Sequence, residues 1–254
     1  MGVWDSYQSR LASRGQSKRD AALQREQDFL RRRLPDHLSY YTAVVDGQER
    51  ELAIINSDNL EQKTVCSMPG EDILGGALVE WAGAHWIVTE RDANNEVYTK
   101  AIMQQCNYLL RWIANDGKIV ERWCIISDGT KYLTGETISS YNENGMSLGD
   151  TRVSLTIARD EYTIQMNRST RLLIDDYESG NVLAYRITKP FKLGNVYNRH
   201  GAMSFVLTEV NTEDDDNMEL HIADYYKHFP RKDGAKLPKP QPIRETADGK
   251  KVWL

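Results

Sequence analysis

Two histidines and two carboxylates late in the chain come nearest to a metal-ligating pattern. His221 and His228 lie seven residues apart, and Glu219 and Asp224 lie beside them. On a helix this spacing would put both imidazoles on one face, but ligands one turn apart would chelate a metal better. We therefore interpret the stretch as a surface segment and expect no metal and no cofactor.

Carboxylates suited to hydrolysis are also poorly placed. Asp175 and Asp176 follow an apolar strand, but adjacent residues of a strand point to opposite faces. The acidic run from Glu213 to Asp216 lacks the alternation and the glycine of a calcium-binding loop. No nucleophile elbow, phosphate-binding loop or dinucleotide-binding glycine pattern occurs. The sequence therefore predicts that the protein is not an enzyme. A hydrolase that uses Asp175, Asp176 or Glu80 is an alternative that no spacing supports.

Aromatic residues offer a binding chemistry instead. Trp81, Trp86, Trp112 and Trp123 lie within one stretch, and the first two flank a short turn. Exposed there, Trp81 and Trp86 could stack, with Tyr98, on the bases of single-stranded nucleic acid or on sugar rings. The same rings would also fill the core of a small β-barrel. We favour the core, and keep an aromatic-lined module for single-stranded nucleic acid or glycan as the alternative function.

A basic helix is predicted near the start of the chain. Ser17 and Asp20 have the spacing of a capping box, and the helix DAALQREQDFLRRRL ends before Pro35. The pattern fits a surface helix, an arm that lies in the groove of a partner, or a helix on a membrane surface. The partner-binding residues predicted on this helix are Leu23, Leu30, Arg31, Arg32 and Arg33.

From Tyr40 onwards the apolar period changes to two. Asp46 and Gly47 between apolar runs predict a hairpin. Further strands are expected over residues 77–81, 85–89, 101–113 and 119–126. Their regular spacing is typical of a β-barrel or a sandwich.

One pattern of strands and turns occurs twice, over residues 76–113 and 170–210. The repeat indicates two small β-barrel or sandwich modules in tandem, within a mainly β fold. The predicted division is an N-terminal helical arm (1–35), a first module (36–140), a second module (141–228) and an extended, proline-rich C-terminal arm (229–254). Trp253 and Leu254 would act as an apolar anchor at the end of that arm.

Charge separates the arms from the body. Residues 1–35 and 229–254 each carry a net charge of +4, whereas residues 36–228 carry −13. Basic arms on an acidic body suggest docking on acidic neighbours or exchange between copies. The acidic body argues against a surface that grips DNA. The chain has three cysteines and no long apolar run, so we expect buried free thiols, no transmembrane helix and no secretory signal.

Residues 56–112 resemble the minor structural proteins of the head–tail connector of tailed bacteriophages. The similarity lies in a Glu-Trp…His-Trp-Ile-Val-Thr hairpin at 80–89 and in IMQQCNYLLRW at 102–112. LLIDDY at 172–177, FVLTEVNTEDDDN at 205–217 and the basic helical start are similar to the same kind of protein.

This resemblance implies a head-closure or stopper-like protein without an active site. Such a protein would form a homo-oligomeric ring in the neck of the virion, after synthesis in the cytoplasm of the bacterial host. It would join the portal or adaptor protein to tail proteins and help to close or line the DNA channel. Packaged DNA would pass nearby without sequence-specific binding, and no membrane would be involved.

Overall fold

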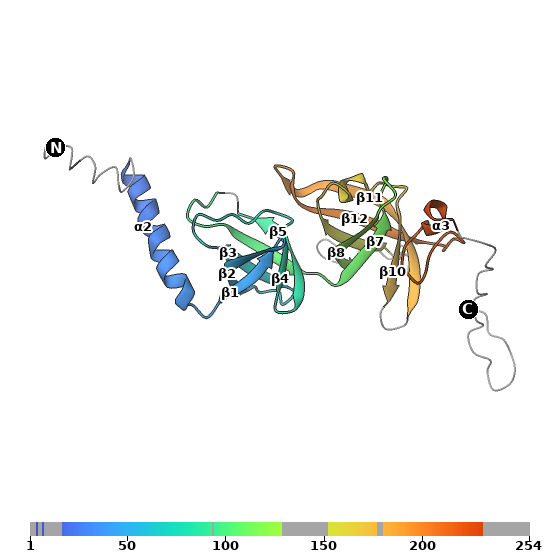
Figure 1. The fold of residues 1–254 in the computed structure, drawn as a ribbon, viewed down its shortest axis with the longest axis horizontal. Helices are drawn as coiled ribbons and strands as arrows, with labels where there is room; N and C mark the ends of the chain where they lie inside the picture. Colours follow the sequence, from blue (N-terminus) through green and yellow to red (C-terminus); the bar gives the residue numbers. More distant parts are fainter. Residues whose placement is uncertain are drawn as a thin grey trace, which may run out of the picture.

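The computed structural model describes residues 17–92, 94–128, 152–176 and 180–230 of the 254, together with Trp4 and Tyr7. Two β modules lie side by side along the length of the molecule, between helix α2 (Lys18–Arg33) at one end and the short helix α3 (Tyr225–His228) at the other (Figure 1). The predicted mainly β fold with two barrel-like modules and an N-terminal helix is confirmed. No helix in the described part of the chain is long and apolar enough to span a membrane.

The first module is a closed barrel with the strand order β1-β2-β3-β6-β5-β4. Its strands are β1 (Tyr40–Val45), β2 (Gln48–Asn56), β3 (Gln62–Ser67), β4 (Leu78–Trp81), β5 (Ala84–Arg91) and β6 (Lys100–Gln105). The predicted hairpin joins β1 to β2, where Asp46 and Gly47 have φ angles of 48° and 79°. Alternate residues such as Leu52, Val65 and Met103 fill the interior, and Ile73 from the β3–β4 connection completes it.

The second module repeats the order of the first. Its strands are β7 (Tyr108–Ile113), β8 (Ile119–Asp128), β9 (Arg152–Ala158), β10 (Arg171–Asp176), β11 (Asn181–Tyr197) and β12 (His200–Val210). They follow the sequence β7-β8-β9-β12-β11-β10, which matches the barrel strand for strand. β7 and β10 form the edges, and across this seam the amide N–H of Asp175 donates to the hydroxyl oxygen of Tyr108 at 3.0 Å. Met166, from the β9–β10 connection, is buried in this core as Ile73 is in the first.

The modules divide at a different place from the predicted one. β7 and β8 belong to the second sheet, so the division falls at Cys106 and Asn107 and not near residue 140. The single strand predicted over 101–113 is two strands, β6 and β7, in different sheets. The N–H of Cys106 donates to the carbonyl of His85 in the first barrel, and the N–H of Asn107 donates to the carbonyl of Cys124 in the second sheet. The two residues between the modules are therefore each hydrogen-bonded to a sheet and do not form a free linker. The crossover predicted near 136–149 lies outside the described residues.

Three further segments lie outside the strands of the two modules. The 3-10 turn η1 (Leu34–Asp36) connects α2 to β1, and η3 (Thr163–Gln165) lies between β9 and β10. After β12, the chain folds back over the outer face of β10 and β11, where Leu173, Ala184 and Ala223 form a small apolar cluster. A bridge between Asn217 and Ile222 and the helical turn α3 end this segment. The predicted C-terminal arm, with Trp253 and Leu254, lies outside the described residues beyond Pro230.

Candidate functional site

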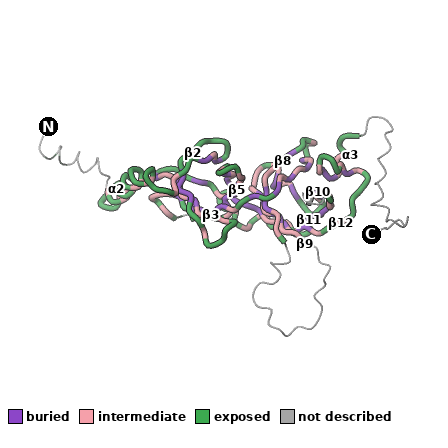
Figure 2. The backbone as a smooth tube through the Cα atoms, turned by 90° about the horizontal axis from the view of Figure 1, so that it is seen from below, coloured by how far each residue is buried: buried purple, intermediate pink, exposed green. Residues whose placement is uncertain are grey.

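Helix α2 begins at the predicted capping box. The side chains of Ser17 and Asp20 accept hydrogen bonds reciprocally from the backbone N–H groups of Asp20 and Ser17. None of its residues is buried, in contrast to the strands of both modules (Figure 2). The side chains of Arg19 and Gln27 donate to Glu96 at 2.8 and 3.1 Å. The helix is therefore attached to the first barrel chiefly through polar contacts.

The predicted partner-binding residues of α2 divide between two faces. Leu23 and Leu30 are half-buried, and Leu23 lines a groove between the helix and the loop 92–97. Arg31 donates to the carbonyl of Pro69 at 3.0 Å, so part of its hydrogen-bonding capacity is used within the chain. Arg32 and Arg33 are exposed. Arg33 lies over the ring of Phe29, which is 51 % exposed and which the sequence prediction left out.

Two of the four tryptophans considered for an aromatic platform lie in the cores, and the other two are half-buried. Trp86 and Trp112 are 5 % and 4 % exposed. Trp81 is half-buried and contacts Trp86 and Tyr41 edge-on or tilted, while Tyr98 is also half-buried. The indole N–H of Trp86 has no hydrogen-bond acceptor among the described residues. Of the three rings considered for stacking, Trp81 and Tyr98 are therefore each accessible only in part to a base or a sugar.

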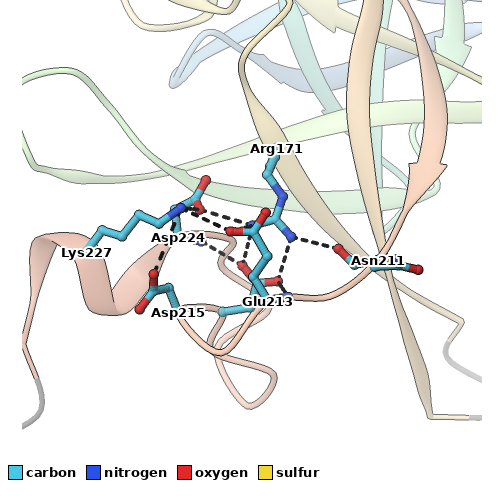
Figure 3. Close-up of polar contacts among 7 residues, drawn as sticks. Arg171, Asn211, Glu213, Asp215, Asp224 and Lys227 are labelled. Carbon is cyan, nitrogen blue, oxygen red and sulfur yellow. Dashed lines mark hydrogen bonds and ion pairs between the residues drawn. The ribbon is translucent and has the colours of Figure 1, made fainter.

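A buried ion-pair network holds the C-terminal segment to the second sheet (Figure 3). Arg171, at the start of β10, donates both terminal nitrogens to the carboxylate of Asp216 at 2.9 Å each, and their side chains are 4 % and 0 % exposed. Arg171 also donates to Asp224 at 3.0 Å and to the Asn211 carbonyl at 3.0 Å. Lys227 extends the network to Asp224 and Glu213 at 2.6 and 3.2 Å.

The network lowers the pKa of one of its carboxylates, that of Asp224. Burial disfavours the charged form of Asp224, but hydrogen bonds and charges from Lys227 and Arg171 outweigh it, so its pKa lies below the usual value. The acidic run that the sequence singled out is thus compensated by two cations of the same chain. The arrangement is that of a structural clamp, since its oxygens are directed at Arg171 and Lys227 and not at an open site.

The other candidate chemical groups are dispersed. His221 lies 3.8 Å from the carboxylate of Asp175, and His228 ends α3. Glu80 lies 4.0 Å from His85 in the first barrel, far along the chain from Asp175. Within the described ranges, no three His, Cys, Asp or Glu side chains are grouped as they would be around a metal ion.

The two modules meet at a packed junction. Ile87 and Cys106 of the first module pack with Ile125 and Ala202 of the second, and the rings of His85 and Trp123 stack with centroids 4.1 Å apart. Gly76 lies directly against the backbone of Gly201.

A cavity of about 480 Å³ opens beside this contact. It is lined by residues of both modules, namely Asp72, Leu74, Gly75, Thr89, Glu90, Arg91, Asn195, Tyr197, Asn198 and His200. The carboxylate of Asp72 is paired with Arg91 at 2.7 Å and accepts from the hydroxyl of Thr99 at 2.8 Å, and these contacts stabilise the wall of the cavity.

Sequence reasoning missed one charged surface, on the hairpin of β11 and β12. Residues 186–200 contain Arg186, Lys189, Lys192 and Arg199 and no carboxylate. On the same hairpin Phe191, Leu193 and Tyr197 are 52 %, 79 % and 71 % exposed. This acid-free run was visible in the sequence, but the net charge of the whole body concealed it.

The three thiols are expected to react slowly in the folded protein. Burial raises the pKa of Cys106 to about 12 and also raises the pKa of Cys124 and Cys66. Because the thiolate is the nucleophile, we expect iodoacetamide at pH 8 to label Cys106 on the order of a thousandfold more slowly than in urea. Mass spectrometry of timed samples measures this rate. Equal labelling of Cys106 and Cys124 with and without urea would contradict the buried geometry.

The chain was compared with protein-family models, curated proteins and solved structures. No protein-family model, curated protein or solved structure matches it.

Proposed function

We propose that this protein is a non-enzymatic structural component of the neck of a tailed bacteriophage. In this proposal it forms a homo-oligomeric ring between the portal or adaptor protein and the tail, and helps to close or line the DNA channel. The resemblance of residues 56–112 motivates the proposal. The structural observation that supports it is helix α2, which extends from one end of the molecule without a buried residue (Figure 1).

The outward side of α2 has the chemistry of an assembly contact. Arg25, Phe29 and Arg32 follow one another at helical spacing on the side opposite the half-buried Leu23 and Leu30. Arg33 adds its guanidinium over the Phe29 ring, 5.6 Å from the centroid. An exposed aromatic ring among arginines is typical of residues that dominate protein interfaces. The acidic body of a neighbouring copy offers charge of the opposite sign.

Removal of α2 is therefore expected to abolish assembly without unfolding the modules. Light scattering across a concentration series should find a large closed oligomer for the full chain and a monomer for residues 36–254. Both barrel-like cores lie outside the deleted segment, so circular dichroism should retain its β signal.

Point variants separate the proposed contact from general effects of charge. Phe29→Ser with Arg32→Glu should raise the concentration needed for assembly by more than about tenfold. Lys118→Glu reverses one charge at a distant exposed turn and should leave assembly unchanged. Assembly of residues 36–254 to full size would refute the role of α2, and a full chain that stays monomeric even with portal protein would refute the ring.

A further inference from the structure

The outer face of β11, β12 and β9 combines cations, one exposed ring and small hydroxyl side chains. Strand pairing places Arg186, Thr208 and Arg152 in one row across the three strands. The next row contains Lys189, Val206 and Ser154, and the third contains Phe191, Ser204 and Thr156. All these side chains point away from the core, since the alternate residues Leu207, Phe205 and Met203 form it.

No carboxylate occupies any position of these three rows. Asp128 pairs with Val153 and Glu209 with Tyr185, so both acids stand at alternate positions that belong to the opposite face. Among the described residues, Arg186 and Lys189 form no ion pair. Lys192 and Arg199 add positive charge towards the tip of the hairpin, although the body as a whole is acidic. The face is thus a local cationic surface on a protein that would otherwise repel polyanions.

The boundaries of this face are set by other parts of the chain. On one side, Arg171 is the next residue in the first row, and the C-terminal segment covers it and neutralises its charge. On the other, Ala202 and Ile125 are buried against the first barrel. The strands between these covers remain accessible, with Phe191 52 % exposed and Arg186 and Lys189 also exposed.

We infer that this face binds a single-stranded polynucleotide. Arginine and lysine neutralise phosphates, and small hydroxyl side chains allow a strand to lie close to the sheet while they donate to phosphate or sugar oxygens. The Phe191 ring offers a surface on which an unstacked base can lie. A duplex would use the cations but would leave this ring without a partner, because its bases are stacked on each other. The inference depends on neither the ring nor the phage assignment.

The test uses the full-length protein and fluorescein-labelled oligonucleotides of equal length, measured by fluorescence anisotropy. Oligo-dT and oligo-rU distinguish DNA from RNA, and a mixed-sequence duplex tests the requirement for a single strand. At about 50 mM salt the single strands should bind. Their log affinity should fall linearly with log salt with a slope of about −2, as expected for three phosphate contacts.

Substitutions assign the binding to this face. Arg186→Glu with Lys189→Glu should weaken binding more than tenfold and reduce the salt slope, and Phe191→Ala should weaken it about tenfold with the slope unchanged. Lys100→Glu is the matched control, because it reverses an exposed strand cation on the first barrel. Circular dichroism and thermal melting confirm that each variant is folded.

Any of four results would overturn the inference. The first is no anisotropy change with either single strand at low salt. The second is an equal loss of affinity in Lys100→Glu, which would show only a general effect of charge. The third is tighter binding of the duplex with no effect of Phe191→Ala, which would make the face a duplex-binding surface. If the Arg186 and Lys189 variant instead loses self-association while no oligonucleotide binds, the face is a contact between copies and the inference also fails.

Discussion

Replacing Arg171 by methionine is expected to lower the free energy of unfolding by about 3–5 kcal/mol, because it leaves Asp216 as a buried charge without its counterion. The carboxylate of Asp216 is fully buried and would keep only the backbone N–H groups of Glu213 and Asp224 as donors. Chemical denaturation with urea, followed by tryptophan fluorescence, measures the loss. The segment after β12 should also become sensitive to proteolysis, since Arg171 is its main polar attachment.

Two companion variants identify burial as the cause. Lys227→Met removes a half-exposed cation from the same network and should cost less than about 1 kcal/mol. Arg171→Met combined with Asp216→Leu removes both buried charges and should recover part of the stability of the single variant. An Arg171→Met protein within about 1 kcal/mol of the original would mean that the network is solvated and that burial does not govern its energetics.

The second large effect is expected at the junction, where Gly76→Ala should destabilise the protein by about 3 kcal/mol or more. Gly76 has a φ of +78°, which side chains rarely adopt. A methyl group there would also overlap the backbone of Gly201 in the second module. The overlap involves main-chain atoms, so no side-chain rotation relieves it. Urea denaturation should show lower stability, and proteolysis should begin near Cys106, where the modules separate.

Gly47→Ala is the matched control for this substitution. Gly47 has a φ of +79°, but a methyl group there would meet no atom within 4 Å. It therefore carries the backbone strain without the overlap and should cost only about 1 kcal/mol. Equal losses in the two variants would show that the close approach of the modules contributes nothing to stability.

Features set by neighbouring residues could be predicted from the sequence. The capping box of Ser17 and Asp20 and the hairpin at Asp46 and Gly47 both occur where expected, because each depends on residues at most three positions apart. The mainly β character followed from the period of two in the apolar residues, and the two modules followed from the repeated pattern of strands and turns. Tryptophans in a small barrel core were also expected, and Trp86 and Trp112 lie there.

The border between the modules was missed because apolar alternation occurs on both sides of it and only its phase changes. Ala101 and Met103 are buried in the first barrel, whereas Tyr108 and Leu110 are buried in the second sheet. The phase therefore changes by one residue near Gln105, which was a signal that a strand had ended. The repeat itself fell on corresponding strands, β4 to β6 and β10 to β12, but it covered only the second half of each module and its first copy ran on into β7.

The candidate surfaces depended on pairings that no local pattern encodes. Arg171 and Asp216 are 45 residues apart, and nothing in the sequence links them. Arg186, Lys189 and Phe191 could be recognised as an acid-free run, but only the register with β12 and β9 shows that they share one face with Ser204 and Ser154. Among the predicted contact residues of α2, Leu23 and Leu30 turned out to lie towards the first barrel.

The common strand order of the two modules has a consequence for how the chain folds. Strands in equivalent positions of the two modules could pair with the wrong neighbours during folding, and β6 is separated from β7 by only two residues. Two antiparallel strands with so short a connection would ordinarily form a hairpin. A nascent chain must therefore complete the first barrel before β7 emerges, or risk a non-native pairing or an exchange of strands between copies. Slow translation or an early closure of the barrel would protect the chain from such non-native pairing. Refolding of the whole chain from urea lacks this order of events and should yield a misfolded fraction.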